Sequence, residues 1–284
     1  HSFFPEQQFI GLANYLAVFA DEEFWRSLRL GLIYSLSTIA LQLALGVAAA
    51  LLLHEAFPGR GLVRAIVIFP YVIPTVVAVV IWKWLLNNQF GLVNYVLEST
   101  GAIDQPISWM GRDWIMVSLI LVSVWQFFPF VVLAVLARLQ TIPPELYEAA
   151  KVDGANALRR FLHVTLPQLA AVLFVVVLLR SIWMFTKFDT PWLMILGGGA
   201  ENYIRTLPIY TYQRTFAWYE AGRGSTMAVL MFLMLVAAAA LYFRLWRREE
   251  RLWGLPAALC IAEGDDLALH GAAVDNDGSS VVFC

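Results

Sequence analysis

The chain has 284 residues, of which 60% are hydrophobic and only 14% are charged, and its formal net charge is −2. A soluble domain is nearer half apolar and a quarter charged, so this composition excludes an ordinary soluble protein and indicates an integral membrane protein. The balanced charge is not that of a nucleic-acid-binding protein. Two cysteines, Cys260 and Cys284, both lie near the end of the chain and do not have the spacing of a disulfide framework or a metal cluster.

Five apolar runs are long enough to cross a bilayer as helices. They cover residues 30–53, 62–86, 115–136, 166–185 and 226–245. The mixed stretch 1–29 precedes them, and Trp25 within it is expected at the headgroup level, so we interpret this stretch as an extracytoplasmic or interfacial segment. The sequence therefore predicts an all-α, polytopic helical bundle in a membrane, with its transmembrane domain over residues 30–253.

Two prolines interrupt the second apolar run. Pro70 and Pro74 stand four residues apart, so both remove backbone donors from one side of the helix and should bend or break it. Carbonyl groups freed at membrane depth are tolerated only inside protein or beside a water-filled cavity. The sequence leaves two interpretations open here, a polar pathway through the membrane and a kinked structural helix.

Residues 137–166, between the third and fourth runs, form a polar segment with a definite helical pattern. Pro144 can open a helix, because the first turn has no N–H to lose. Gly154 permits the left-handed residue that ends a helix. A second short helix can begin near Asn156, and Pro167 fits the first turn of the next apolar run. The pattern predicts a short helix, a glycine turn and a second short helix at the membrane surface.

Basic residues are distributed unevenly between the two sides of the predicted bundle. One side holds 10 Lys and Arg residues in the 49 residues of segments 54–64, 137–164 and 244–253. The other side holds 7 in the 97 residues of segments 1–29, 87–114 and 186–225. Because cytoplasmic loops carry the excess of Lys and Arg, the first side is predicted to be cytoplasmic, together with the C-terminus.

Catalytic chemistry has little support in the sequence. The four histidines have no metal-ligand spacing and no phosphate-binding P-loop is present, so we expect the chain to bind no metal, cofactor or ATP of its own. A structural membrane scaffold is a further alternative, although it would not need a cytoplasmic helical hairpin. The last stretch, 254–284, has no Lys or Arg and no periodic pattern, and it is expected to be a disordered acidic tail.

The segment between the third and fourth runs also carries a family motif. Glu148-Ala149-Ala150 is followed after three residues by Gly154, and after nine more by Val164-x-Leu166-Pro167. This pattern resembles the EAA loop of ABC importer permeases, with a valine in place of an isoleucine. Further blocks resemble the carbohydrate-importer branch of that family, of the binding-protein-dependent maltose and trehalose type. They include Phe9-Ile10-Gly11-Leu12, Gly59-Arg60-Gly61-Leu62, Trp82-Lys83-Trp84-Leu85 and Leu207-Pro208.

The resemblance implies a type I ABC importer permease that moves a mono- or oligosaccharide across a bacterial cytoplasmic (inner) membrane. It implies cytoplasmic ATP-binding subunits, an extracytoplasmic solute-binding protein and a second permease subunit, which in this branch is usually a different chain. Because the family's first membrane helix would precede residue 1, five of six spans are expected in this sequence. The alternative is the same machinery carrying glycerol phosphate or another polar solute.

Two sets of residues are candidates for function. In the family, the EAA loop docks on the ATP-binding subunit, and the resemblance assigns this role to Glu148, Ala149, Ala150, Asp153, Gly154, Leu166 and Pro167. The candidate substrate path consists of Tyr71, Trp125, Gln126, Trp183 and Asp189. Aromatic faces in this path could stack on sugar rings, and the same side chains could instead pack the bundle or form an aromatic belt. Arg180, a charge within an apolar run, could pair with Asp189.

Overall fold

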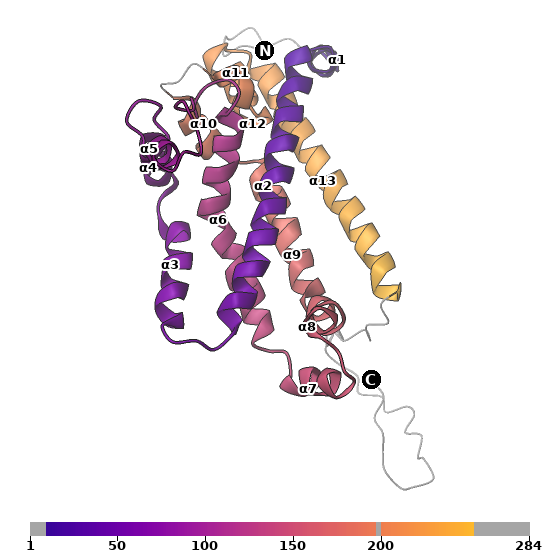
Figure 1. Cartoon of the computed structure of the whole chain (residues 1–284). Coiled ribbons are helices and arrows are strands. Elements are labelled where there is room, and N and C mark those ends of the chain that lie inside the picture. The colour runs from indigo at the N-terminus through magenta and orange to yellow at the C-terminus, as the bar shows by residue number, and fades with distance from the viewer. Residues whose placement is uncertain (1–9, 197–199, 253–284) are drawn as a thin grey trace, which may run out of the picture. The chain divides into compact units, whose positions relative to one another are not determined.

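The computed structural model describes residues 10–196 and 200–252, and every regular element in these ranges is helical (Figure 1). Its centre consists of three long helices. α2 (Glu22–His54) packs lengthwise on α6 (Ile115–Leu139), and both helices contact α9 (Leu166–Phe185). The compact unit that carries these contacts extends to Phe243.

By length and hydropathy, four helical stretches in the described residues can cross a membrane, and one bent pair can form a fifth span. The four stretches are Glu22–His54, Ile115–Leu139, Ala157–Ile195 and Ala221–Trp246, the last of which belongs to α13 (Ala221–Leu252). The bent pair consists of α3 (Arg60–Val72) and α4 (Thr75–Leu85), whose axes meet at 101°. The predicted all-α membrane bundle is confirmed, and so is the predicted break beside the prolines of the second run.

α2 begins well before the predicted start of the first span at residue 30. Asp21 accepts a hydrogen bond from the Glu23 N–H at 3.1 Å and caps the helix, and acids in its first turn are favoured by the helix dipole. The apolar pattern does not show this start, because the charged residues Glu22, Glu23, Arg26 and Arg29 interrupt it in the first two turns of α2. The boundary that we drew at residue 29 therefore falls inside a continuous helix.

Segments 87–114 and 186–225 connect predicted spans, and both contain short helices that the sequence analysis does not predict. The first contains α5 (Leu92–Ser99), and the second contains α10 (Asp189–Ile195), α11 (Glu201–Ile204), α12 (Leu207–Tyr212) and the π-helix η2 (Gln213–Ala217). An acid opens α10 and a proline stands in the first turn of α12, so these helices start from local signals without a long apolar stripe. Residues 1–9, the glycine run 197–199 and the tail 254–284 lie outside the described residues.

An ion network joins the start of α2 to the segment around α12 and η2. The Asp21 carboxylate accepts hydrogen bonds from the Tyr210 hydroxyl at 2.5 Å and from the Arg214 guanidinium at 2.7 Å, and Arg214 also pairs with Glu220 at 2.7 Å. Burial raises the pKa of Tyr210 to about 12, so its hydroxyl stays protonated and keeps donating at neutral pH. The network fixes two segments that are far apart in the sequence at the same end of the bundle.

Close packing of α2 on α6 depends on a glycine. A Cβ atom built on Gly46 would lie 2.5 Å from the Cβ atom of Val131 and 3.3 Å from the carbonyl oxygen of Phe128. Real Cβ atoms do not approach a neighbour this closely, so the two helices can meet here only where α2 has no side chain. The valine belongs to the apolar core shared by α2, α6 and α9.

We predict that Gly46→Ala lowers the free energy of unfolding by about 1–3 kcal/mol, because the added methyl group overpacks the helix crossing. Gly31→Ala is the matched control on the same helix, since a Cβ atom there would meet only ordinary contacts at 3.8 Å and 3.9 Å. Thermal unfolding of the detergent-solubilised chain measures both. Equal unfolding midpoints for the two variants would contradict the importance of this contact.

Candidate functional site

The segment between α6 and α9 folds as the predicted helical hairpin. α7 (Pro144–Val152) has Pro144 in its first turn, and Gly154 follows with a left-handed φ of 76°. The side chain of Asn156 then accepts a hydrogen bond from the Arg159 N–H at 2.9 Å and caps α8 (Ala157–Arg160). These are the signals read from the sequence, and each acts locally. Figure 1 places α7 and α8 at the opposite end of the central helices from α10, α11 and α12.

This hairpin projects from the bundle. α7 contains no buried residue, and Glu148, Ala149, Asp153 and Gly154 are all exposed. Within the described part of the chain, the Glu148 carboxylate makes no ion pair. The exposed surface of α7 therefore includes the small side chain of Ala149 and the carboxylate of Glu148. Of the remaining candidates for coupling, Leu166 is exposed, whereas Ala150 and Pro167 are half-buried.

A second group of side chains meets between α3, α6 and α9, and we call it the aromatic cluster: Tyr71, Phe127, Phe130 and Trp183. Tyr71 lies 6.5 Å from Phe127 and 6.2 Å from Phe130, measured between ring centroids. Phe130 lies 5.3 Å from Trp183. Tyr71 and Trp183 are 37% and 42% exposed, so both side chains lie at the surface of the bundle.

Arg180 packs against this cluster, and the residue is only 2% exposed. Its carbon Cζ is 5.1 Å from the ring centroid of Phe127 and 5.9 Å from that of Trp183. Its Nε donates to the amide oxygen of Gln42 at 2.8 Å, and the amide nitrogen of Gln42 donates to a backbone carbonyl of α6 at 3.0 Å. Its Nη2 also lies 3.5 Å from the sulfur of Met184, so ring faces, an amide and a thioether together partly compensate this buried cation.

The pairing of Arg180 with Asp189 that the sequence suggested is wrong. Asp189 pairs instead with Lys187, two residues away, at 3.0 Å. The Lys187 ammonium in turn lies 4.4 Å from the ring centroid of Phe127. Asp189 therefore touches the edge of the aromatic cluster through Lys187, and the cluster has two cations beside it and one acid.

The two remaining path candidates lie elsewhere. Gln126 is 1% exposed, and its amide nitrogen donates to the carbonyl oxygen of Ile73 at 3.2 Å and to the hydroxyl of Thr75 at 3.3 Å. These groups flank the break between α3 and α4, so Gln126 satisfies a carbonyl that the broken helix leaves free. Trp125 packs edge-on against Trp82 of α4, at 5.5 Å between centroids.

Sequence reasoning missed Phe127, Phe130, Lys187 and Gln42. The spacing of the two phenylalanines, three residues apart on α6, was a signal, because such residues share one helix face. Gln42 was also visible as a buried amide within an apolar run, where polar side chains are costly and often functional. Its partner could not be read, because Arg180 is far away in the sequence.

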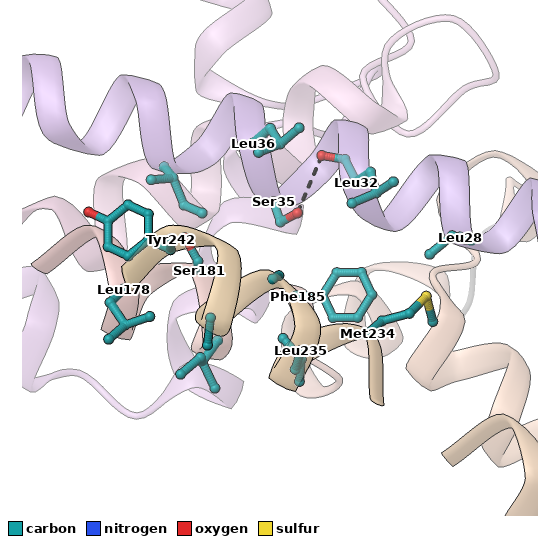
Figure 2. Close-up of a pocket in the computed structure, with 14 residues that line it drawn as sticks. Leu28, Leu32, Ser35, Leu36, Leu178, Ser181, Phe185, Met234, Leu235 and Tyr242 are labelled. Carbon is teal, nitrogen blue, oxygen red and sulfur yellow. Dashed lines mark hydrogen bonds between the residues drawn. The ribbon is translucent and has the colours of Figure 1, made fainter. Parts of the chain in front are cut away.

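A different cavity, of about 330 Å³, lies between α2, α9 and α13 (Figure 2). Its walls are formed mainly by leucine, isoleucine, alanine, methionine and aromatic side chains. Both serines in the wall are already satisfied, since Ser35 donates to the carbonyl of Leu32 and Ser181 donates to that of Val177. The cavity suits acyl chains rather than a polar ligand, so the aromatic cluster remains the candidate site for a polar solute.

Membrane-spanning helices around a polar and aromatic interior, with a projecting hairpin at one end, define a membrane permease. The chain belongs to the family described as the inner membrane component of binding-protein-dependent transport systems, whose sequence profile matches residues 42–251. Members of this family are transport subunits rather than enzymes, and this chain is an integral membrane transport subunit of that kind.

Relatives match most of the chain. It is 36% identical over 249 residues to the trehalose/maltose transport system permease protein MalF of Thermococcus litoralis, covering 87% of this chain and 82% of the relative. It is 35% identical to the sulfoquinovosyl glycerol transport system permease protein SmoG of Agrobacterium fabrum, covering 86% and 78%. A chain of a bacterial ABC transporter involved in alginate import has the same fold, with a TM-score of 0.78, 21% identity and coverage of 86% and 85%.

We predict that cysteines introduced at Tyr71 and Trp183 react readily with a polar thiol reagent, whereas a cysteine at Gln126 reacts slowly. The first two side chains have exposed rings, and the third is enclosed beside the helix break. Labelling rates in membranes, after Cys260 and Cys284 are replaced by serine, measure this difference. Fast labelling at position 126 with slow labelling at the other two would show that water reaches the α3–α4 break rather than the aromatic cluster.

Proposed function

We propose that this chain is the permease subunit of a bacterial ABC importer that carries a mono- or oligosaccharide across the cytoplasmic (inner) membrane. The observation that carries the proposal is the match, over most of their length, to permeases named for trehalose and maltose and for sulfoquinovosyl glycerol. ATP hydrolysis would take place in separate ATP-binding subunits.

The aromatic cluster supports a sugar as the cargo. Sugar rings have an apolar face and a rim of hydroxyl groups, so they are bound by aromatic faces together with planar hydrogen-bond donors. Tyr71 and Trp183 offer such faces from α3 and α9. Arg180 is 2% exposed and has five N–H donors, of which Nε donates to Gln42 and one on Nη2 donates to the sulfur of Met184. The path that we propose therefore runs beside Tyr71, Trp183 and Asp189, with Trp125 and Gln126 supporting the α3–α4 break at its side.

The alternative cargo, glycerol phosphate or another polar solute, also has an observation in its favour. Arg180 and Lys187 both lie beside the aromatic cluster, and the only acid paired with either is Asp189, among the residues described. A site with one excess cation suits an anionic solute. Protection of a Trp183→Cys variant from labelling by maltose, or by glycerol 3-phosphate, separates the two alternatives.

The hairpin of α7 and α8 is the proposed contact with the ATP-binding subunit. Ala149 and Ala150 keep one side of α7 small, so a groove on a partner could approach the helix backbone. Glu148 could accept hydrogen bonds from a cationic group of that partner. Asp153 and Gly154 would shape the turn, and Leu166 and Pro167 would set the start of α9 behind it.

The other partners follow from the orientation. The density of basic residues supports a cytoplasmic hairpin and a cytoplasmic C-terminus. An extracytoplasmic solute-binding protein would then deliver cargo to the opposite end, which carries α5, α10, α11 and α12. A second permease subunit, in this proposal a different chain, would complete the membrane part.

We predict that Glu148→Lys and Gly154→Val weaken binding of the ATP-binding subunit and abolish most transport. Charge reversal removes the proposed acceptor, and a β-branched residue at a φ of 76° strains the turn by roughly 1–2 kcal/mol. Co-purification of the ATP-binding subunit and solute uptake into vesicles measure the two effects.

Matched controls separate this role from general damage. Glu55→Lys reverses an exposed acid at the same end of the bundle but outside the hairpin, and should leave both readouts unchanged. Gly154→Asn should be mild, because asparagine tolerates the left-handed conformation. Normal transport by both Glu148→Lys and Gly154→Val, with the ATP-binding subunit still bound, would refute the coupling role of the hairpin.

A further inference from the structure

α7 is held to the membrane helices by few side chains. Of its residues, only Tyr147 and Ala150 are even partly buried. The Tyr147 ring packs against the apolar core that α2, α6 and α9 share. Its hydroxyl lies 3.1 Å from the hydroxyl of Thr165, which is 4% exposed. Thr165 ends the π-helix η1 (Phe161–Thr165), which runs directly into α9.

A second connection joins the two helices that flank the hairpin. Arg138, near the end of α6, donates from Nε to the carbonyl oxygen of Gln168 at 3.0 Å and from Nη2 to its side-chain oxygen at 2.8 Å. Gln168 lies in the first turn of α9. The remaining Nη1 donates to Thr141, just beyond the end of α6, at 3.2 Å. The guanidinium of Arg138 therefore connects the end of α6, the start of α9 and the short segment that leads to α7.

We propose that the Tyr147–Thr165 contact and the Arg138–Gln168 bridge, together named the brace, transmit movement of α7 to α6 and α9. This inference rests on the proposed coupling function of the hairpin. The turn at Gly154 is exposed and a Cβ atom there would meet nothing, so no packed side chain at this turn ties α7 to the membrane helices. Packed side chains and hydrogen bonds between rigid elements can transmit a rigid-body movement of α7 to the membrane helices. Tyr147, Thr165, Arg138 and Gln168 are then positioning residues that need not touch cargo or nucleotide.

The test uses the full complex of this chain, its second permease and the ATP-binding subunits in lipid vesicles. A Trp183→Cys reporter on α9, in a chain without other cysteines, is labelled with a polar thiol reagent before and after MgATP and vanadate close the ATP-binding subunits. The readout is the ratio of the two labelling rates, which requires no cargo. A residue with a merely structural role would change the yield of complex or both rates together, and would leave this ratio intact.

We expect Tyr147→Phe and Thr165→Val each to reduce the nucleotide-dependent change in labelling by about fivefold, the factor that one neutral hydrogen bond supplies. The double variant should be no worse than either single variant, because both remove the same bond. Both substitutions keep the ring packing and the volume at position 165, so the complex should still assemble. Gln168→Leu should also reduce the change, and Gln140→Leu, an exposed glutamine at the same end of the bundle, is its control.

The outcomes separate this inference from the proposed function. A full nucleotide-dependent change in Tyr147→Phe, Thr165→Val and Gln168→Leu, with the ATP-binding subunit bound, would overturn the brace and leave the importer intact. Additive losses in the double variant would likewise overturn the Tyr147–Thr165 contact as the connection. Failure of the unsubstituted hairpin to bind any ATP-binding subunit would refute the proposed function itself, and the brace with it.

Discussion

The arrangement of the central helices depends on the burial of one guanidinium. Arg180 stands within a membrane-spanning helix, where an uncompensated charge costs several kcal/mol. α2 contributes Gln42 as its hydrogen-bond acceptor, and α6 contributes two phenylalanine rings. None of these groups compensates the charge alone, so the three helices must meet at one point. The same meeting point positions the rings of the aromatic cluster, so the groups that stabilise the bundle also shape the proposed site for cargo.

Much of this fold follows from local signals and could be predicted from the sequence. The apolar runs fix the spans, Pro74 marks the break, and Pro144, Gly154 and Asn156 define the hairpin, because each acts within one or two helical turns. The start of α2 was misplaced, since it depends on a capping aspartate rather than on apolar residues. Short helices in segment 186–225 were missed for a similar reason.

Residues of the candidate site were harder to predict, because their partners are distant in the sequence. Asp189 is close to Arg180 in the sequence and was the expected partner for its charge. Lys187 is closer to Asp189 and forms the ion pair instead. Gln126 had the chemistry of a path residue, and the structure uses it to satisfy the broken helix. Only tertiary packing decides which buried polar groups face a ligand and which serve the backbone. The turns and caps of the hairpin escape this difficulty, because Pro144, Gly154 and Asn156 act locally and depend on no distant contact.

The broken span has a consequence for how this part of the chain can cross the bilayer. α3 has 13 residues and so rises roughly 20 Å, whereas the hydrocarbon core of a bilayer is about 30 Å thick. α3 packs along α6, and the axis of α4 bends away from that of α3 by 101°, where α4 packs on α10 and α6. α3 alone is too short to cross this core, so this part of the chain can form a fifth span only as the bent pair of α3 and α4.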